Sequence, residues 1–267
     1  MNNATLLGID HVVIAVNDLA VAAADYRALG FSVTPGGRHP GRATENALVV
    51  FADGAYLELI TYHAPAPDER WWRTLQAAGS GFVDHALWPE DTLAALAAAR
   101  ARGLDALVGP VPGSRVRPDG QRIEWVSARA TTPELPFLCA DRTPRALRVP
   151  EGEARRHANG AQGIAELVVA VDALDAALAR CRALLGPALP LVTAPPDAQG
   201  LQRAHYRLGA QRLQLVAPGP ATAPGHALRE RLHRRGPGPC ALTLAAGGGT
   251  PRALDLAACH GAAITLA

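Results

Sequence analysis

The chain has 267 residues, of which 49% are hydrophobic and 19% are charged, and its formal net charge is +2. This composition is typical of a globular protein and excludes disorder as the dominant state, while so small a net charge gives no reason to expect a nucleic-acid partner. At about 150 residues per domain, the length favours one large or two ordinary domains.

Several reaction classes are excluded by residue types that are missing or misplaced. All 26 basic residues are Arg, which excludes Schiff-base chemistry, pyridoxal-phosphate attachment and a Walker-type phosphate loop, because each needs a Lys amine. No Ser lies in a G-x-S-x-G motif, and the Cys residues are too widely spaced for a zinc site of the Cys type or a disulfide framework. No apolar run is long enough for a membrane span, and the first four residues lack a signal-peptide pattern. We therefore expect a soluble, cytoplasmic protein with no membrane partner.

An internal repeat organises the chain. Four apolar strands with period-two alternation are each followed by an Ala-rich run with helical spacing that ends near Gly. The strands start at Gly8, Gly81, Gly163 and Gly238, roughly 75 residues apart, which fits a small α+β unit better than a solenoid repeat. The predicted helices cover residues 19–29, 93–102, 174–185 and 251–259.

Three further strands are predicted after the first helix, at residues 31–34, 46–51 and 55–60, so the unit reads βαβββ. The segment 36–41 between the first two is interpreted as a loop, and Asp53-Gly54 is a tight hairpin signal. The fourth unit ends after its first strand, helix and second strand, which indicates either a short sheet edge or a partner that fills the edge in a homodimer. Segments rich in Pro, Gly and charge predict linkers at residues 65–70, 142–160 and 218–225, with a linker helix at 68–78.

Two polar residues stand in otherwise apolar strands of the first unit. Period-two alternation places His11 on one face of the first strand with Val13 and Ala15, and Glu58 on one face of the last strand with Tyr56 and Ile60. Burying either side chain without a partner costs several kcal/mol, and a metal ion would satisfy both. The second unit repeats the His as His85, whereas the third and fourth units offer no such donors. The alternative is that these polar side chains form hydrogen bonds with other protein groups and bind no metal.

These features resemble the vicinal oxygen chelate superfamily, and more narrowly its glyoxalase-like domain branch. The resemblance covers residues 7–218 well and 236–267 weakly. It rests on Gly8-Ile9-Asp10-His11, Gly36-Gly37-Arg38-His39-Pro40-Gly41, Asn46-Ala47-Leu48, Tyr56-Leu57-Glu58-Leu59, Leu135-Pro136-Phe137-Leu138 and His157-Ala158-Asn159-Gly160. It implies an α+β fold in which repeated βαβββ modules form curved mixed sheets with helices on the outer face. We expect one domain over residues 1–145 and a second, without metal ligands, over residues 146–267.

The resemblance also implies a metal site formed by His11, Glu58 and His85, with one divalent ion (Zn, Fe, Mn or Ni) and Glu58 as a residue that could act as a general base. A fourth ligand is left open between Glu124, Asp141 and none. Fewer residues separate His85 from Glu124 than separate His11 from Glu58, which leaves little room for a helix and two strands. We therefore place Glu124 on the third strand of its module.

Candidate substrate-binding residues surround these positions. The rim of the substrate pocket is expected to bind an anion or a carbonyl group through Arg38, His39, Thr44 and Asn46. The alternative is that these residues form a loop with exposed charges. Tyr56 and Trp125 suit the wall of a substrate pocket, and the alternative is plain core. Arg115 and Arg117 are interpreted as residues of a solvated turn.

The expected function is that of a metal-dependent enzyme of the lyase, isomerase or dioxygenase type, acting on a small substrate with vicinal oxygens. The alternative is a metal-free protein that binds or sequesters a small molecule, as the bleomycin-resistance members of the superfamily do.

Overall fold

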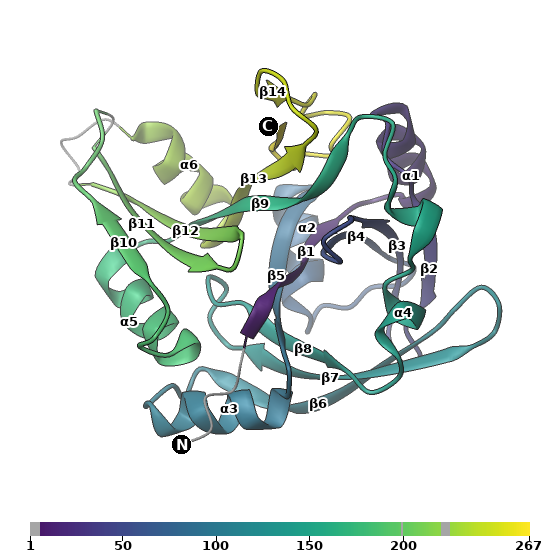
Figure 1. Cartoon of the computed structure of the whole chain (residues 1–267), viewed down its shortest axis with the longest axis horizontal. Helices are drawn as coiled ribbons and strands as arrows, with labels where there is room; N and C mark the ends of the chain where they lie inside the picture. Colours follow the sequence, from purple (N-terminus) through teal and green to yellow (C-terminus); the bar gives the residue numbers. More distant parts are fainter. Residues whose placement is uncertain (1–5, 199, 220–224) are drawn as a thin grey trace.

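The first eight strands of the chain close into a barrel, and the later strands form a separate seven-stranded sheet beside it (Figure 1). The computed structural model describes residues 6–198, 200–219 and 225–267. Around the barrel the strand order is β1-β4-β3-β2-β6-β7-β8-β5. The bounds are β1 Leu6–Ala15, β2 Thr34–Arg38, β3 Thr44–Val50, β4 Tyr56–Tyr62, β5 Gly81–Pro89, β6 Leu107–Val116, β7 Arg122–Ala130 and β8 Phe137–Asp141.

Two βαβββ modules build this barrel, as the repeat predicts. Each module pairs its first strand in parallel with its fourth, β1 with β4 and β5 with β8, and the modules join through the antiparallel pair β1–β5. The helices are α1 (Leu19–Ala28), α2 (Arg70–Ala78) and α3 (Thr92–Ala101). The carboxylates of Asp18 and Asp91 accept backbone N–H bonds at the starts of α1 and α3, which satisfies donors that a helix end leaves free. Part of the predicted loop 36–41 belongs to β2 instead, because β2 pairs with β3 through Arg38.

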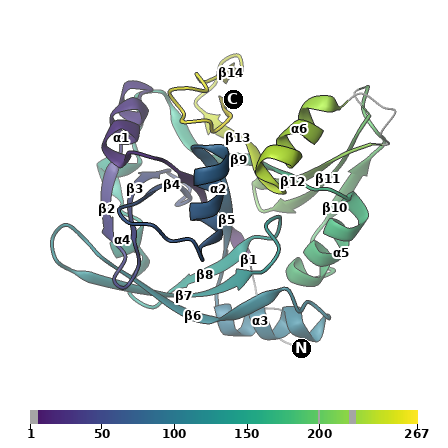
Figure 2. The same ribbon diagram turned by 180° about the vertical axis from the view of Figure 1, so that it is seen from behind.

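The second sheet has the order β10-β11-β12-β9-β13-β15-β14 (Figure 2). Its bounds are β9 Ala161–Ala170, β10 Leu191–Ala194, β11 Leu201–Leu208, β12 Gln211–Pro218, β13 Gly238–Ala246, β14 Arg252–Ala253 and β15 Ile264–Leu266, with helices α5 Leu174–Leu185 and α6 His226–Arg235. The third module is complete, with β9 parallel to β12. The homodimer suggested for the edge of the fourth module stays a prediction.

The predicted helix at residues 251–259 is wrong. The backbone N–H of Leu254 donates to the carbonyl of Ile264, which ties this segment to β15 and interrupts a helix. Only a single turn remains, in which the Asp255 carboxylate accepts from the N–H of Ala258. β15 runs parallel to β13, the position that the fourth strand takes in the other modules. Among the described residues, the last module therefore keeps its first and fourth strands and, between them, only the two-residue strand β14, which pairs antiparallel with β15.

The segment 142–160, predicted as a linker, lies on the barrel. It contains the short helix α4 (Arg145–Arg148) and a 3-10 turn (Gly152–Arg155). The ring of His157 bonds the N–H of Ser32 at 2.9 Å and the carbonyl of Val50 at 3.0 Å. The residues just after the predicted domain boundary at 145 thus pack against the first unit. Most of the linker predicted at 218–225, residues 220–224, lies outside the described residues, as do residues 1–5.

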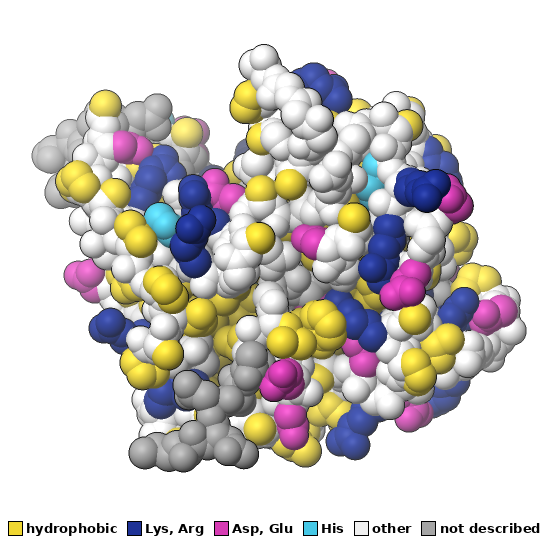
Figure 3. Space-filling view, viewed as in Figure 1, with side chains coloured by type: hydrophobic (Ala, Val, Ile, Leu, Met, Phe, Trp, Pro, Cys, Tyr) yellow, Lys and Arg dark blue, Asp and Glu magenta, His cyan; other side chains and the backbone are white. Residues whose placement is uncertain are grey.

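A continuous apolar core joins the barrel to the second sheet. Val12 and Leu87 of the barrel belong to the same buried cluster as Leu167 and Leu242 of the second sheet. On the face in Figure 3, hydrophobic side chains gather where the two sheets meet. No helix among the described residues is both long and apolar enough to cross a membrane.

His85 is fully buried beside this core, opposite Val12 on β1. Neither ring nitrogen of His85 has a hydrogen-bond partner among the described residues. Burial, with smaller contributions from the charges of Arg70 and His11, lowers the pKa of His85 from 6.5 to about 3. The imidazole is therefore neutral in the folded protein at pH 7.

His85→Leu is expected to make the protein less sensitive to acid. In the wild type, His85 binds a proton below about pH 6.5 in the unfolded chain but stays neutral in the folded chain down to about pH 3. The free energy of unfolding therefore falls by about 1.4 kcal/mol for each pH unit between pH 6.5 and pH 3, and His85 does not change it above pH 6.5. The variant lacks this contribution. Urea unfolding at pH 7, 5.5 and 4.5 measures it, and equal losses for both proteins would contradict the assignment.

Candidate active site

Inward side chains of the barrel strands surround a pocket of about 120 Å³. Of the predicted substrate-binding residues, five line it: His39, Thr44, Asn46, Tyr56 and Trp125. Arg38 does not, because its side chain is 71% exposed and pairs with Glu45 at 3.3 Å outside the pocket. The predicted rim is therefore correct in position except at Arg38.

Glu58 is the buried carboxylate of this pocket. Its Oε1 accepts a hydrogen bond from Asn46 Nδ2 at 2.5 Å. The Nε2 atom of His11 lies 3.5 Å from Oε2, and the Nε2 atom of His39 lies 3.9 Å from Oε1. Burial alone would raise the pKa of Glu58, but the two imidazoles and the Asn46 hydrogen bond outweigh it and hold the pKa below its usual value. Glu58 is thus an ionised base at neutral pH.

His11 is fixed in orientation by a buried partner. Its Nδ1 lies 2.7 Å from Asp10 Oδ2, and its ring stacks on Tyr56 with centroids 4.6 Å apart. Burial acts to raise the pKa of Asp10, but Arg148 foremost, with His11 and Arg145, holds it well below the usual value. Because Asp10 is ionised, Nδ1 of His11 carries a hydrogen and Nε2 faces Glu58.

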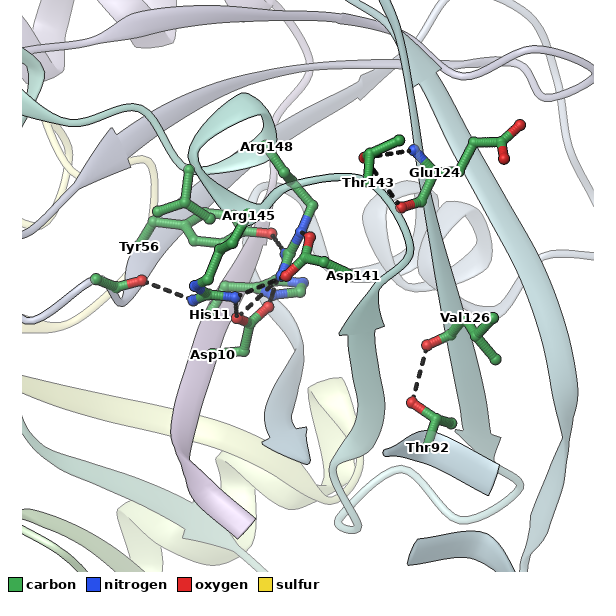
Figure 4. Close-up of polar contacts among 12 residues, drawn as sticks. Asp10, His11, Tyr56, Thr92, Glu124, Val126, Asp141, Thr143, Arg145 and Arg148 are labelled. Atoms are coloured by element: carbon green, nitrogen blue, oxygen red, sulfur yellow. Dashed lines mark hydrogen bonds and ion pairs between the residues drawn. The ribbon is translucent and has the colours of Figure 1, made fainter. Parts of the chain in front are cut away.

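Figure 4 shows the cluster that holds Asp10 in place. Arg148 of α4 donates from Nη1 to Asp10 Oδ2 at 2.8 Å and to the Tyr56 hydroxyl at 2.6 Å, and from Nε to Asp141 Oδ1 at 2.5 Å. Arg145 pairs with Asp10 at 2.7 Å and Asp141 at 3.1 Å. Both arginines therefore bind the Asp141 carboxylate, so Asp141 is not free to serve as the fourth metal ligand.

His39 is the second imidazole beside Glu58. Its Nδ1 lies 3.0 Å from the Thr44 hydroxyl, and its ring meets Trp125 edge-on with centroids 6.1 Å apart. Burial, only partly offset by Glu58, lowers the pKa of His39 below 6.5. His39 is therefore neutral at pH 7 and able to accept or share a proton at Nε2.

The predicted metal site is not assembled. His11 and Glu58 adjoin, but His85 faces the outer core with Val12 and does not line the pocket. Glu124 lies on β7, the third strand of its module as predicted, where it is exposed and pairs with Arg122 at 2.9 Å. In the part of the chain that the structure describes, no three His, Cys, Asp or Glu side chains are arranged to hold a metal ion. The residues present do not fit the metal that the resemblance implied.

The pocket residues that the sequence analysis did not assign to the site include Trp71, Arg115, Arg129 and Phe137. Arg115, interpreted as part of a solvated turn, belongs to β6 and is only 3% exposed. Arg129 alternates with Trp125 and Ser127 along β7, so period two applied to the whole strand would have placed it inward. Trp71 comes from α2, and nothing in the linker pattern signals its contact with the barrel.

Comparisons with known proteins agree on the fold. The chain is similar to a hypothetical protein from Staphylococcus aureus, with 11% identity, a TM-score of 0.72, and coverage of 97% of this chain and 98% of that one. It is similar to a mutant of 4-hydroxymandelate synthase from Streptomyces coelicolor, with 17% identity, a TM-score of 0.65, and coverage of 93% and 72%. A fusion of a xylose isomerase-like TIM barrel with a 4-hydroxyphenylpyruvate dioxygenase matches with 19% identity and a TM-score of 0.57, over 92% of this chain and 37% of that one.

A search of curated proteins finds no match to the sequence. The family model described as a glyoxalase-like domain matches residues 9–185, which is more than half of the chain. This match spans the whole barrel and continues through β9 and α5. The chain therefore belongs to the glyoxalase-like domain family.

Proposed function

We propose that the chain is an enzyme of the isomerase or lyase type that moves a proton on a small organic anion bound in the barrel pocket. The observation that carries the proposal is the ionised, buried Glu58, which has one imidazole facing each carboxylate oxygen. A carboxylate held in this way is positioned to act as a general base. The proposed reaction uses only side chains that line the pocket.

The charge of the pocket supports an anionic substrate. Arg42, Arg115 and Arg129 line it, whereas its lining carboxylates are Glu58 and Glu69. Arg115 is buried, and Tyr56 and Glu58 both act to raise its pKa, although neither forms an ion pair with it. A buried guanidinium costs several kcal/mol unless it is paired, so a bound anion would stabilise the site.

The side chains suffice for a balanced proton transfer. Glu58 takes a proton from a carbon next to a carbonyl group, and the electron pair of that C–H bond moves onto the carbonyl oxygen. Arg115 would stabilise the resulting enolate by hydrogen bonding. Where the deprotonated carbon carries a hydroxyl group, the hydroxyl proton passes to the enolate oxygen and the proton held by Glu58 is delivered to the former carbonyl carbon, which gives isomerisation. Where the carbon on the other side of the deprotonated carbon carries a leaving group, the electron pair of the enolate expels that group, which gives elimination.

Consumption of small carbonyl-containing carboxylates, followed by proton NMR, tests this proposal. We expect turnover by the wild type that survives EDTA, because the mechanism uses side chains alone. Glu124→Gln, which changes an exposed carboxylate of β7, should leave the rate unchanged. Turnover that stops with EDTA and returns with Zn, Fe, Mn or Ni would contradict the proposal and support a metal-dependent reaction.

A further inference from the structure

Arg129 is a pocket residue without a partner of its own. Its Nε atom is buried and makes no hydrogen bond, and within the described residues its guanidinium forms no ion pair. Its Cζ atom lies 5.5 Å from the centroid of the Trp71 ring. A cation over an aromatic ring gains some attraction, but far less than a hydrogen-bonded carboxylate would give.

Asp84 and Glu69 act to raise the pKa of Arg129, but both carboxylates are already bound by other groups. Asp84 accepts from Arg70 and, at 2.8 Å, from Trp71 Nε1. Glu69 accepts from the Tyr62 hydroxyl at 2.8 Å and pairs with Arg42 at 4.0 Å. Arg42 and Arg129 also repel each other, since each cation disfavours the charge of the other. An anion from outside the chain would relieve both problems.

The walls beside Arg129 are aromatic. Trp71 and Phe137 approach with ring centroids 6.0 Å apart, and Trp125 lies on the same face of β7 as Arg129. The pocket volume of about 120 Å³ is below that of an engineered cavity of about 150 Å³ that takes up benzene, so it limits the ligand to a single ring. Charge and size together describe one ring with one anionic group.

We propose that the pocket recognises a small molecule that carries one carboxylate and one aromatic ring, with the carboxylate on Arg129 and the ring against Trp71 and Phe137. This inference names the substrate class of the proposed enzyme and rests on that proposal for the reaction, though not for the binding. Arg129 is then a residue that determines specificity. A bidentate hydrogen-bonded pair of guanidinium and carboxylate explains why Arg, and not a neutral donor, occupies this position.

Calorimetric titration with benzoate tests the inference. We expect benzoate to bind the wild type, and benzamide, its neutral analogue, to bind at least about 30-fold more weakly. Arg129→Gln should weaken benzoate by a similar factor and raise the melting temperature of the unliganded protein, because an unpaired buried charge is removed. Arg122→Gln, the same change at an exposed position of β7, should alter neither the benzoate affinity nor the melting temperature.

Several outcomes would overturn the inference. These are equal binding of benzoate and benzamide to the wild type, unchanged benzoate binding by Arg129→Gln, or inorganic phosphate binding as tightly as benzoate. The comparison of benzoate with benzamide needs no variant, so it holds even if Arg129→Gln does not fold. If Arg129→Gln loses benzoate binding but no turnover is found, the binding site stands and the proposed enzyme fails.

Discussion

Arg148→Met is expected to lower the free energy of unfolding by about 3–5 kcal/mol at pH 7. Arg148 is only 3% exposed, and its guanidinium donates to Asp10, Asp141 and Tyr56. Met fills a similar volume but leaves the fully buried Asp10 carboxylate with a weaker set of partners. Urea unfolding measures the change.

The matched control is Arg156→Met, which lies a few residues later and pairs with Glu153 in solvent at 78% side-chain exposure. Its loss should stay within about 0.5 kcal/mol, as is usual for surface substitutions. Equal effects of the two substitutions would show that the Asp10 cluster contributes nothing special, and the orientation argued for His11 would lose its support.

Glu58→Gln is expected to reduce turnover by about 10²- to 10⁴-fold, the usual contribution of a general base. Gln keeps the shape and can still bond Asn46 by turning its amide, but it cannot accept a proton at neutral pH. Benzoate affinity should not fall, because the substitution removes a negative charge from an anion site. Steady-state kinetics and calorimetry on one preparation measure both quantities.

The outcome is read against Glu124→Gln, which should match the wild type. Undiminished turnover by Glu58→Gln would remove Glu58 from the reaction and leave the pocket as a binding site. Loss of turnover together with loss of benzoate binding would indicate a collapsed pocket and not a missing base.

The fold was predictable where local pattern and packing agree. Gly at each strand start and a helical Ala-rich run give the βαβββ module, and its parallel first and fourth strands appear in the barrel and again in the second sheet. The pattern failed at residues 251–259, where helix propensity is favourable but Leu254 pairs with β15. Such tertiary pairing has no signature in a short apolar run.

The site was predictable for His11 and Glu58 but not for His85. In the β1–β5 pair, Ile9 opposes Leu87, and without a bulge His11 would oppose His85 on the same face. An irregularity between Ile9 and His11 shifts the register by one residue, so His11 opposes Ala86 and His85 turns to the outer core. The repeated His therefore gave a wrong prediction for His85, because a one-residue shift in register moves the following side chains to the other face of the sheet and the sequence does not reveal such a shift.

The most direct test of Glu58 as a base is transfer of solvent deuterium to a bound carbonyl compound. Wild-type protein in D₂O would be incubated with an arylpyruvate, which carries a carbonyl group, an acidic C–H bond, a carboxylate and one aromatic ring, and the carbon next to the carbonyl would be followed by NMR. We expect deuterium incorporation that is faster than in buffer and that is lost in Glu58→Gln. Binding of the compound with incorporation no faster than in buffer would contradict the account and favour a protein that only sequesters its ligand.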